Sequence, residues 1–368
     1  MSDLLYQIAL TQVPMVGDVT AKLLYAHFGS AHNIFTSNNK QLQDTLGVGT
    51  GIAKSIIAHR DACLKRAEEE LRFIEKNNIK TCIYGSASYP KNLRECHDAP
   101  LLLYYKGNID IDNKYTLAIV GTRKSTPYGE AMTEQIVEDL KEYNVNIISG
   151  LAYGIDVTAH RASLTHNIAT IGVLAHGLNK LYPAAHAQVA KRMIENDGAV
   201  MTEFISGTNP DRENFPKRNR IVAGLSDAVL VVEAAASGGA LITADIAHTY
   251  NKDVFAIPGR CNDELSIGCN NLIKYNKAAL VNSAADIAKF MSWQKKADAP
   301  VHKQESMFEF VNDDEKLIYE TIKNATNINI DELSIQAKMP ISKLSVALLN
   351  MEFGRQIKAL PGKRYMAL

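Results

Sequence analysis

The sequence predicts an α/β protein in which a doubly wound parallel sheet is flanked by an N-terminal all-α domain and a C-terminal winged helix. From Lys80 to Phe290, short apolar runs alternate with amphipathic helical patterns. Such alternation is typical of parallel strands that are covered by helices on both faces of the sheet. Before Lys80 the apolar residues recur at helical spacing, and after residue 312 helical patterns precede two strand patterns.

The length of 368 residues is enough for two or three domains. We predict a helical domain over residues 1–79, the sheet domain over residues 80–291 and a winged helix over residues 313–368. Residues 292–312 show little periodicity and are predicted to be a linker.

Two similar stretches organise the N-terminal domain. Residues 13–18 and residues 46–51 each place a short glycine-containing turn between two helical patterns. They predict a pair of helix-hairpin-helix units in a sterile-alpha-motif-like bundle, whose backbone N–H groups suit a DNA phosphate. A small packing domain that binds nothing is the favoured alternative, because only Lys22 and Lys54 follow the hairpins. The mixed-charge run 65–76 predicts a solvated helix face.

Eight apolar runs predict the strands of the central sheet. They are residues 81–84, 102–105, 117–120, 145–148, 170–174, 199–201, 228–232 and 253–256. Helical patterns lie between most of them, for example over residues 130–143 and residues 154–165. In such a sheet, ligands bind beyond the C-terminal ends of the strands.

Glycine-containing turns follow several of these strands. A glycine turn that opens a helix exposes backbone N–H groups, which attract anions. Threonine hydroxyls and the arginine fork also suit phosphate oxygens. The turn residues that we assign to the candidate site are Gly121, Thr122, Arg123, Ser149, Gly150, Ser237, Gly238 and Gly239.

A cluster of cations follows an aromatic residue shortly before the strand at residues 228–232. Its members are Phe215, Lys217, Arg218, Asn219 and Arg220. Alone, such a cluster is often a solvated turn, but beside the glycine turns it favours a phosphate-bearing ligand. Phe215 is either a core residue or a stacking platform for a base. A carboxylate and a histidine follow Gly150 at helical spacing. We expect Asp156 to accept hydrogen bonds from backbone N–H groups at the start of its helix, and His160 to form a hydrogen bond with Asp156. This arrangement is structural rather than catalytic.

Composition narrows the range of functions. The 40 basic and 40 acidic residues give no net charge, so any nucleic-acid site must be locally positive. The five cysteines show neither a CxxC motif nor metal-ligand spacing, and they indicate reduced thiols in a cytoplasmic protein. We expect no metal, no cofactor, no secretory signal at residues 1–10 and no transmembrane helix.

The winged helix is weakly basic. A DNA-binding winged helix carries cations on its third helix. Here that helix offers only Lys343, with Arg355 just beyond it. Lys363 and Arg364 stand at the expected tip of the wing. Contact with DNA and a protein-interaction or packing role both stay open for this domain.

Taken together, these motifs resemble the DprA/Smf family of DNA-processing proteins, in both order and spacing. The matching stretches are Gly121-Thr122-Arg123, residues 149–156, Tyr182-Pro183, residues 215–221, residues 237–244 and residues 255–259. The resemblance implies an extended Rossmann-like domain that binds single-stranded DNA with the glycine turns and the basic cluster. It also implies a homodimer through that domain, an interaction with RecA, and loading of RecA onto DNA covered by single-strand-binding protein during natural transformation.

Three other classes of protein compete with this interpretation. Nucleotide phosphoribohydrolases carry a PGGxGTxxE signature, but here residues 237–245 lack its second half and its glutamate. A winged-helix transcription factor would need a more basic third helix. A dinucleotide-binding enzyme is disfavoured because Gly121-Thr122-Arg123 is not G-x-G-x-x-G. ATP-driven motion is not expected, because the sequence has no Walker A motif. We therefore predict a protein without catalytic residues.

Overall fold

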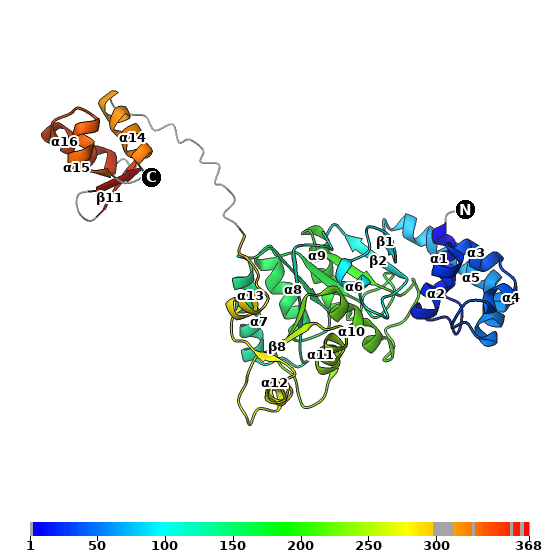
Figure 1. Ribbon diagram of the computed structural model, residues 1–368. Helices are drawn as coiled ribbons and strands as arrows, with labels where there is room; N and C mark the ends of the chain where they lie inside the picture. The colour runs from blue at the N-terminus through cyan, green and yellow to red at the C-terminus, as the bar shows by residue number, and fades with distance from the viewer. Residues whose placement is uncertain (1–2, 297–312, 326–327, 354–355, 361–363, 368) are drawn as a thin grey trace. The chain divides into compact units, whose positions relative to one another are not determined.

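The structure is a computed structural model (Figure 1). It describes residues 3–296, 313–325, 328–353, 356–360 and 364–367. The chain divides into two units, Met1–Lys296 and Ala297–Leu368. Within the described ranges, no helix combines the length and the apolar character that crossing a bilayer requires.

A mixed sheet forms the centre of the larger unit. Its strands are β1 (Lys80–Ile83), β2 (Leu102–Gly107), β3 (Tyr115–Val120), β4 (Val145–Ser149), β5 (Thr170–Val173), β6 (Ala199–Thr202), β7 (Ala228–Val231), β8 (Asp253–Ala256) and β9 (Ala279–Leu280). They lie in the order β1-β2-β6-β5-β4-β3-β7-β8-β9. Neighbours from β6 to β9 are parallel, whereas β2 is antiparallel to both β1 and β6.

The sheet confirms the predicted fold class, with an antiparallel extension at one edge. Apolar runs predict that β1 and β2 are strands, but strand direction depends on which neighbour each one pairs with. The short strand β9 was not predicted, because two residues are too few to show a period.

Helices cover both faces of this sheet. One face carries α6 (Lys91–Arg94), α10 (Asn214–Leu225), α11 (Gly239–Thr249) and α12 (Ile267–Lys274). The other carries α7 (Pro127–Leu140), α8 (Ile155–Thr165) and α13 (Ala284–Phe290). Alternation along β3 separates the two cores, because Ala118 and Val120 face the first set while Leu117 and Ile119 face the second. The remaining helix α9 (Ala187–Glu195) packs with Leu151 and Val200.

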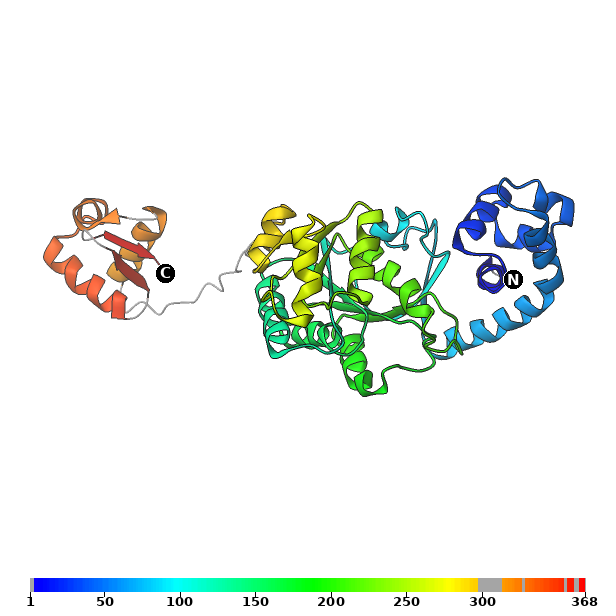
Figure 2. The same cartoon turned by 90° about the horizontal axis from the view of Figure 1, so that it is seen from below.

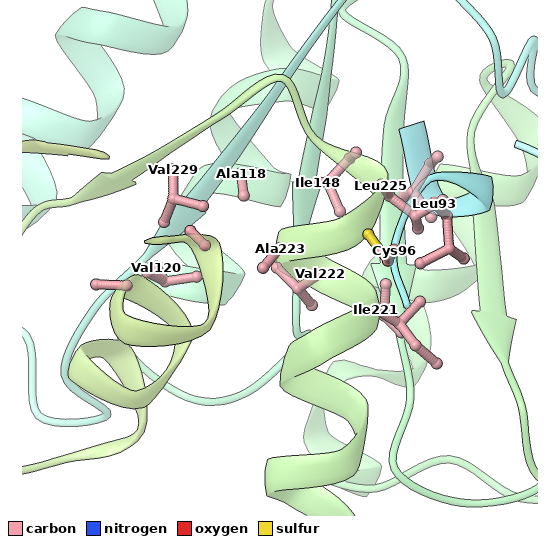
Figure 3. Close-up of a cluster of buried hydrophobic side chains, with 14 of the residues drawn as sticks. Leu93, Cys96, Ala118, Val120, Ile148, Ile221, Val222, Ala223, Leu225 and Val229 are labelled. Carbon is pink, nitrogen blue, oxygen red and sulfur yellow. The ribbon is translucent and has the colours of Figure 1, made fainter. Parts of the chain in front are cut away.

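Helix α10 lies at the centre of the first face (Figure 3). Its fully buried Ile221 and Val222 belong to the same core cluster as Ile148 of the sheet and Leu93 of α6. Gly224 allows this approach, because a Cβ atom there would overlap the Leu93 side chain. The backbone of α10 is therefore held by packing on the sheet and on α6.

The N-terminal segment is helical, as expected. Its helices are α1 (Asp3–Thr11), α2 (Asp18–Phe28), α3 (Ala31–Thr36), α4 (Asn39–Gln43) and α5 (Thr50–Lys76). The two predicted hairpins join α1 to α2 and α4 to α5. The first hairpin turns toward the sheet, because Asp18 accepts hydrogen bonds from the Leu101 backbone N–H at 3.0 Å and from Arg220. Contact of these hairpins with DNA stays a prediction.

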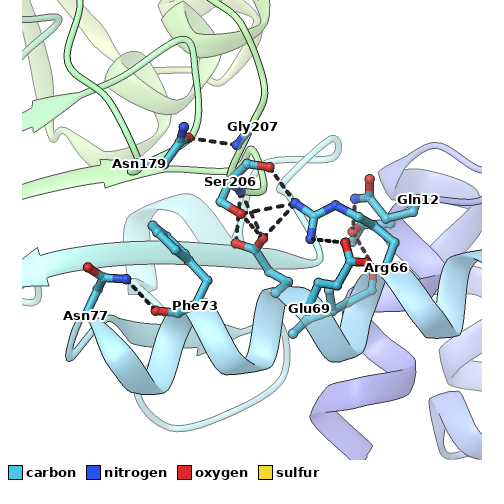
Figure 4. Close-up of polar contacts among 11 residues, drawn as sticks. Gln12, Arg66, Glu69, Phe73, Asn77, Asn179, Ser206 and Gly207 are labelled. Atoms are coloured by element: carbon cyan, nitrogen blue, oxygen red, sulfur yellow. Dashed lines mark hydrogen bonds and ion pairs between the residues drawn. The ribbon is translucent and has the colours of Figure 1, made fainter.

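The second half of α5 attaches the N-terminal helices to the sheet. Figure 2 shows this helix, in light blue, extending from the N-terminal helices toward the sheet. Glu70 is 2% exposed and accepts a 2.9 Å hydrogen bond from the Ser206 backbone N–H. Arg66 donates to Glu70 and to the Ser206 carbonyl (Figure 4). The prediction of a solvated face over residues 65–76 is therefore wrong at Glu70, because charge patterning does not show which charges meet a partner.

The smaller unit is a winged helix, as predicted. Helices α14 (Asp313–Ala325), α15 (Ile330–Gln336) and α16 (Ile341–Phe353) pack with an antiparallel sheet of β10 (Ile328–Asn329), β12 (Arg364–Ala367) and β11 (Ile357–Leu360). Its core includes Leu333, Leu344 and Leu348. On α16, Lys343 pairs with Asp314. Arg355 and Lys363 lie outside the described residues, and Arg364 is exposed.

The start of the predicted linker belongs to the larger unit. Trp293 is 7% exposed and its ring stacks on Tyr115, with the ring centroids 5.0 Å apart. Residues 297–312 lie outside the described ranges.

Candidate functional site

A cleft of about 270 Å³ opens beyond the C-terminal ends of β3 and β7. These strands are neighbours at the point where strand order reverses, since β4, β5 and β6 follow on one side and β8 and β9 on the other. Ligands of doubly wound sheets bind at such a switch point. The predicted site residues that line the cleft are Gly121, Thr122, Arg123, Phe215, Arg218, Asn219, Ser237, Gly238 and Gly239.

The turn after β3 is held from two sides. The Thr122 backbone N–H donates to the Glu233 carbonyl at 2.8 Å, and the Thr122 carbonyl accepts from the Ile155 N–H at 3.2 Å. Gly154 has a φ of +75°, and a Cβ atom there would overlap the Thr122 carbonyl. The Thr122 N–H is thus already used, and the turn offers its hydroxyl and the Arg123 side chain instead.

Arg123 is the exposed cation of the cleft. Its guanidinium lies over the half-buried Phe215 ring, 5.0 Å from the ring centroid. Such a cation–π contact orients the guanidinium while leaving its N–H donors free on the outer side. Phe215 is therefore neither a plain core residue nor an isolated surface ring.

The turn after β7 forms the opposite wall. Ser237, Gly238 and Gly239 are exposed and lead into α11. No side chain caps this helix, and its first turn carries no acidic residue. Because the first N–H groups of an α-helix lack intrahelical partners, this end of α11 attracts anions. Asn219 braces the turn by donating to the Gly239 carbonyl at 3.2 Å.

Helix α10 divides the predicted cation cluster. Residues 217–220 lie within a helix rather than in a turn, so neighbouring residues point in different directions. Lys217 and Arg220 line a separate hollow of about 440 Å³ between the N-terminal helices and the sheet. Arg220 pairs there with Glu203 and, at 3.0 Å, with Asp18. The resemblance implied that the side chains of residues 217–220 all bind DNA at one site, and this expectation is wrong for Lys217 and Arg220.

Arg218 supports the cleft from inside. It is 4% exposed and donates to the Val173 carbonyl at 2.7 Å. Gly150 leaves room for it, because a Cβ atom there would overlap the guanidinium. Ser149 is also buried and donates to the Ile119 carbonyl at 2.6 Å. Arg218, Ser149 and Gly150 thus shape the scaffold.

The expected pair of Asp156 and His160 does not form. Asp156 accepts a weak 3.4 Å hydrogen bond from the Ala152 N–H. Burial raises the pKa of its carboxyl group, and the opposing effect of Arg218 is smaller. His160 instead lies 2.7 Å from the Thr170 hydroxyl, which itself donates to the Ile147 carbonyl. The His160 Nδ1–H must therefore be the donor. Spacing of four residues allows a contact between side chains but does not select it over a partner on the sheet.

Burial makes His160 a neutral residue. It is fully buried, and its Nε2 atom has no hydrogen-bond partner within the described part of the chain. Burial, together with the nearby Arg218, lowers the pKa of His160 to about 3.

Two tyrosines that were not assigned to the site line a second hollow next to the cleft. Tyr153 and Tyr182 share this hollow with Arg123, Phe215 and Gly150. Both tyrosines follow strand-end turns, after β4 and β5, and that position is the sequence signal that points to them. Among the described residues, no group of three or more histidine, cysteine or acidic side chains is arranged to hold a metal ion.

Comparison with known proteins identifies related families. The DNA recombination-mediator protein A family matches residues 80–292, and the DprA winged helix domain matches residues 309–363. Protein Smf of Escherichia coli (strain K12) is 35% identical over 303 residues, which cover 81% of this chain and 80% of that protein. Protein Smf of Synechocystis is 37% identical over 289 residues, covering 77% of this chain and 71% of that protein.

Two solved structures are also similar. DNA processing protein A from Streptococcus pneumoniae aligns with a TM-score of 0.65 and 31% identity, over 80% of this chain and 99% of that one. DNA processing protein A from Helicobacter pylori, solved to show its single-stranded DNA binding mode, aligns with a TM-score of 0.53 and 27% identity. That alignment covers 59% of this chain and 97% of the other.

We expect Gly154→Ala to destabilise the protein more than Gly207→Ala. Both glycines have a positive φ, +75° and +86°, so both substitutions carry a backbone penalty of about 1–3 kcal/mol. Only at Gly154 does the new Cβ meet backbone atoms, whereas Gly207 faces open space. Overpacking should add about 1–3 kcal/mol. Urea unfolding measures the difference, and equal midpoints would show that the turn after β3 is not tightly held.

We expect His160 to make the protein less stable as the pH falls below 6.5. The unfolded histidine binds a proton near pH 6.5, whereas the folded one does so only near pH 3. The contribution of His160 to the free energy of unfolding is therefore fully present above pH 6.5, and it decreases by about 1.4 kcal/mol for each pH unit below that value. Urea unfolding at pH 7, 6 and 5 should show a smaller decrease for His160→Asn, which keeps a donor toward Thr170. The exposed His248→Asn is the control, and parallel curves for all three proteins would contradict this account.

Proposed function

Because the chain belongs to the DNA recombination-mediator protein A family, we propose that it is a non-enzymatic recombination mediator that binds single-stranded DNA in the cleft between β3 and β7. The observation that carries this proposal is the uncapped N-terminus of α11 and the exposed Arg123 guanidinium in one cleft. Backbone N–H groups and a guanidinium are both phosphate ligands.

The proposed contacts are fewer than the sequence suggested. Arg123, the Thr122 hydroxyl and the N–H groups at Gly239 hold phosphates, and Asn219 keeps the turn before α11 in place. Phe215 stacks on a base. We assign Arg218, Ser149 and Gly150 to support of the cleft, and we place Lys217 and Arg220 outside it, because of the contacts described above.

Single-stranded DNA fits this site better than a duplex. An aromatic ring beside phosphate ligands favours bases that are free to unstack, and a duplex keeps its bases paired. In the winged helix, the only cation described on α16 is paired with Asp314, which argues against duplex reading by that helix. Sequence preference should be slight, since phosphate contacts carry no base information.

The carboxylates near the cleft support a binding role rather than a catalytic one. Glu233 is buried and accepts hydrogen bonds from the Thr126 backbone N–H at 2.9 Å and from the Thr126 hydroxyl at 2.5 Å. Asp156 is buried beside Arg218. Both groups are therefore engaged with the scaffold, and neither is presented as a free general acid or base.

The assembly that we propose is a dimer. The edge strand β9 and its flanks expose Leu280, Tyr275 and Phe290, which are 48%, 64% and 62% exposed. Exposed apolar groups beside an open sheet edge favour association. A chain without net charge should bind DNA weakly at a single cleft. Two linked clefts in a dimer would bind one DNA strand more tightly.

The family also supports the proposed partners. In this role the dimer interacts with RecA and loads it onto DNA covered by single-strand-binding protein, during natural transformation. These partners place the protein in the cytoplasm. The resemblance of the motifs to the family carries this part of the proposal.

We expect Arg123→Ala to bind labelled oligo-dT at least about tenfold more weakly than wild type in fluorescence anisotropy. The loss of one phosphate contact should also reduce the slope of log affinity against log salt by about one. In RecA-driven strand exchange on DNA covered by single-strand-binding protein, wild type should stimulate the reaction and the variant should not.

The matched control is Lys191→Ala, which removes a cation on α9 whose side chain is 68% exposed. It should bind and stimulate as wild type does. Wild-type affinity in Arg123→Ala, or equal losses in both variants, would place the DNA elsewhere on the protein.

We expect Leu280→Glu to convert the dimer to a monomer in sedimentation velocity, because it places a charge at the edge of the sheet. Leu46→Glu is the control, since Leu46 is 90% exposed on the second N-terminal hairpin and lies outside the proposed interface. A dimeric Leu280→Glu protein would rule out this edge as the interface.

A further inference from the structure

Two tyrosine rings form a surface beside the phosphate cleft. Tyr153 and Tyr182 are each 48% exposed and line one hollow with Phe215 and Arg123. Tyr182 meets Phe215 edge to face, with the ring centroids 6.4 Å apart. In the part of the chain that the structure describes, neither tyrosine hydroxyl has a hydrogen-bond partner. We call Phe215, Tyr182 and Tyr153 the aromatic shelf.

Buried histidines hold both tyrosines in place. The Tyr182 backbone N–H donates to His176 Nε2 at 3.1 Å, while His176 Nδ1 lies 2.9 Å from the Gly177 carbonyl. The ring of Tyr153 meets His186 edge to face at 4.9 Å, and His186 Nδ1 donates to the Leu151 carbonyl at 2.9 Å. His176 and His186 are 1% and 2% exposed. Buried histidines therefore fix the backbone of Tyr182 and support the ring of Tyr153.

This support matters for binding. Flat aromatic side chains held in advance lose little conformational freedom when a ligand covers them. Half of each tyrosine surface stays in water, and a flat, uncharged partner that covers it would remove apolar area from solvent. Next to a phosphate site, the flat partner that a polynucleotide offers is a base.

Arg123 connects the shelf to the cleft. It lines the phosphate cleft with Gly238 and Gly239, and it also lines the hollow of the two tyrosines. A phosphate bound at Arg123 would therefore leave the neighbouring nucleotide within reach of Phe215, and the next ones within reach of Tyr182 and Tyr153. The rings of the shelf continue from the cleft on the side of β4 and β5. On the side of β8 the exposed ring is Tyr128, whose hydroxyl is held by the Pro258 carbonyl.

We propose that Tyr182 and Tyr153 are base-stacking residues, which bind successive bases of the strand whose phosphate lies at Arg123. This inference rests on the proposed function, and it adds a direction, since it sends the strand from α11 across the ends of β4 and β5. Stacking on a ring tolerates every base, so the shelf adds affinity without sequence preference.

Abasic DNA separates base contacts from phosphate contacts. The experiment compares labelled oligo-dT with an oligonucleotide of the same length in which tetrahydrofuran sites replace the bases. Tyr182→Ala and Tyr153→Ala should each bind oligo-dT about tenfold more weakly than wild type, which corresponds to about 1.4 kcal/mol. On the abasic oligonucleotide both variants should match wild type, because no base remains to be stacked. Tyr182→Phe, which keeps the ring, should bind oligo-dT as wild type does.

Three controls make the outcome decisive. Arg123→Ala should weaken binding to both oligonucleotides. Tyr128→Ala removes a ring that is 47% exposed on the β8 side, where its hydroxyl donates to the Pro258 carbonyl, and should change neither affinity. If an alanine variant does not fold, Tyr182→Leu keeps an apolar side chain without a ring and gives the same comparison.

The outcomes distinguish this inference from the proposed function. If wild type binds neither oligonucleotide, or if Arg123→Ala binds both normally, the proposed function is wrong. If Arg123→Ala is weak but the tyrosine variants bind oligo-dT normally, the shelf alone is wrong. Equal losses on both oligonucleotides in Tyr182→Ala would show a structural role, and a loss specific to oligo-dT in Tyr128→Ala would reverse the direction of the strand.

Discussion

Arg218 carries a guanidinium into the interior of the protein, and the cleft depends on how that charge is satisfied. A buried cation is strongly unfavourable unless hydrogen bonds and an opposite charge compensate it. Here the Val173 carbonyl accepts one hydrogen bond, and the carboxylate of Asp156 lies nearby. Gly150 is needed at the end of β4 because any side chain there would occupy the space of the guanidinium. The ends of β4 and β5 and the start of α8 are thereby tied to one side chain of α10.

The same helix links the cleft to the N-terminal helices. While Phe215 and Asn219 line the cleft, Arg220 points the other way and pairs with Glu203 and Asp18. Burial raises the pKa of Glu203 to about 7, with Arg220 acting to lower it. Because the apolar side of α10 is fixed on the sheet, these two polar regions keep a constant separation. The phosphate ligands and the attachment of the N-terminal helices therefore share one rigid element.

The turns of the site were predictable for a simple reason. In a parallel sheet the carboxyl ends of the strands lie at one edge, so the glycine turns after residues 117–120 and 228–232 were expected at the same edge. The structure brings them together by pairing β3 with β7. Lys217 and Arg220 were misplaced because consecutive cations were treated as one cluster, whereas a helix sends residues 217 and 218 to different sides. Tyr153 and Tyr182 were not assigned to the site, because their position after strand ends indicates the right edge of the sheet but does not show whether each ring is exposed or buried.

The sequence by itself determined the class of fold, the order of the strands along the chain, the winged helix and the family, because periodicity and short motifs are local properties. Only the tertiary structure decided which polar side chains are free. Arg123 and Arg218 have the same chemistry, yet one lies exposed over a ring while the other is buried and donates to a strand carbonyl. The burial of a side chain and its hydrogen-bond partners depend on contacts between segments far apart in the sequence, so a local sequence pattern does not predict them.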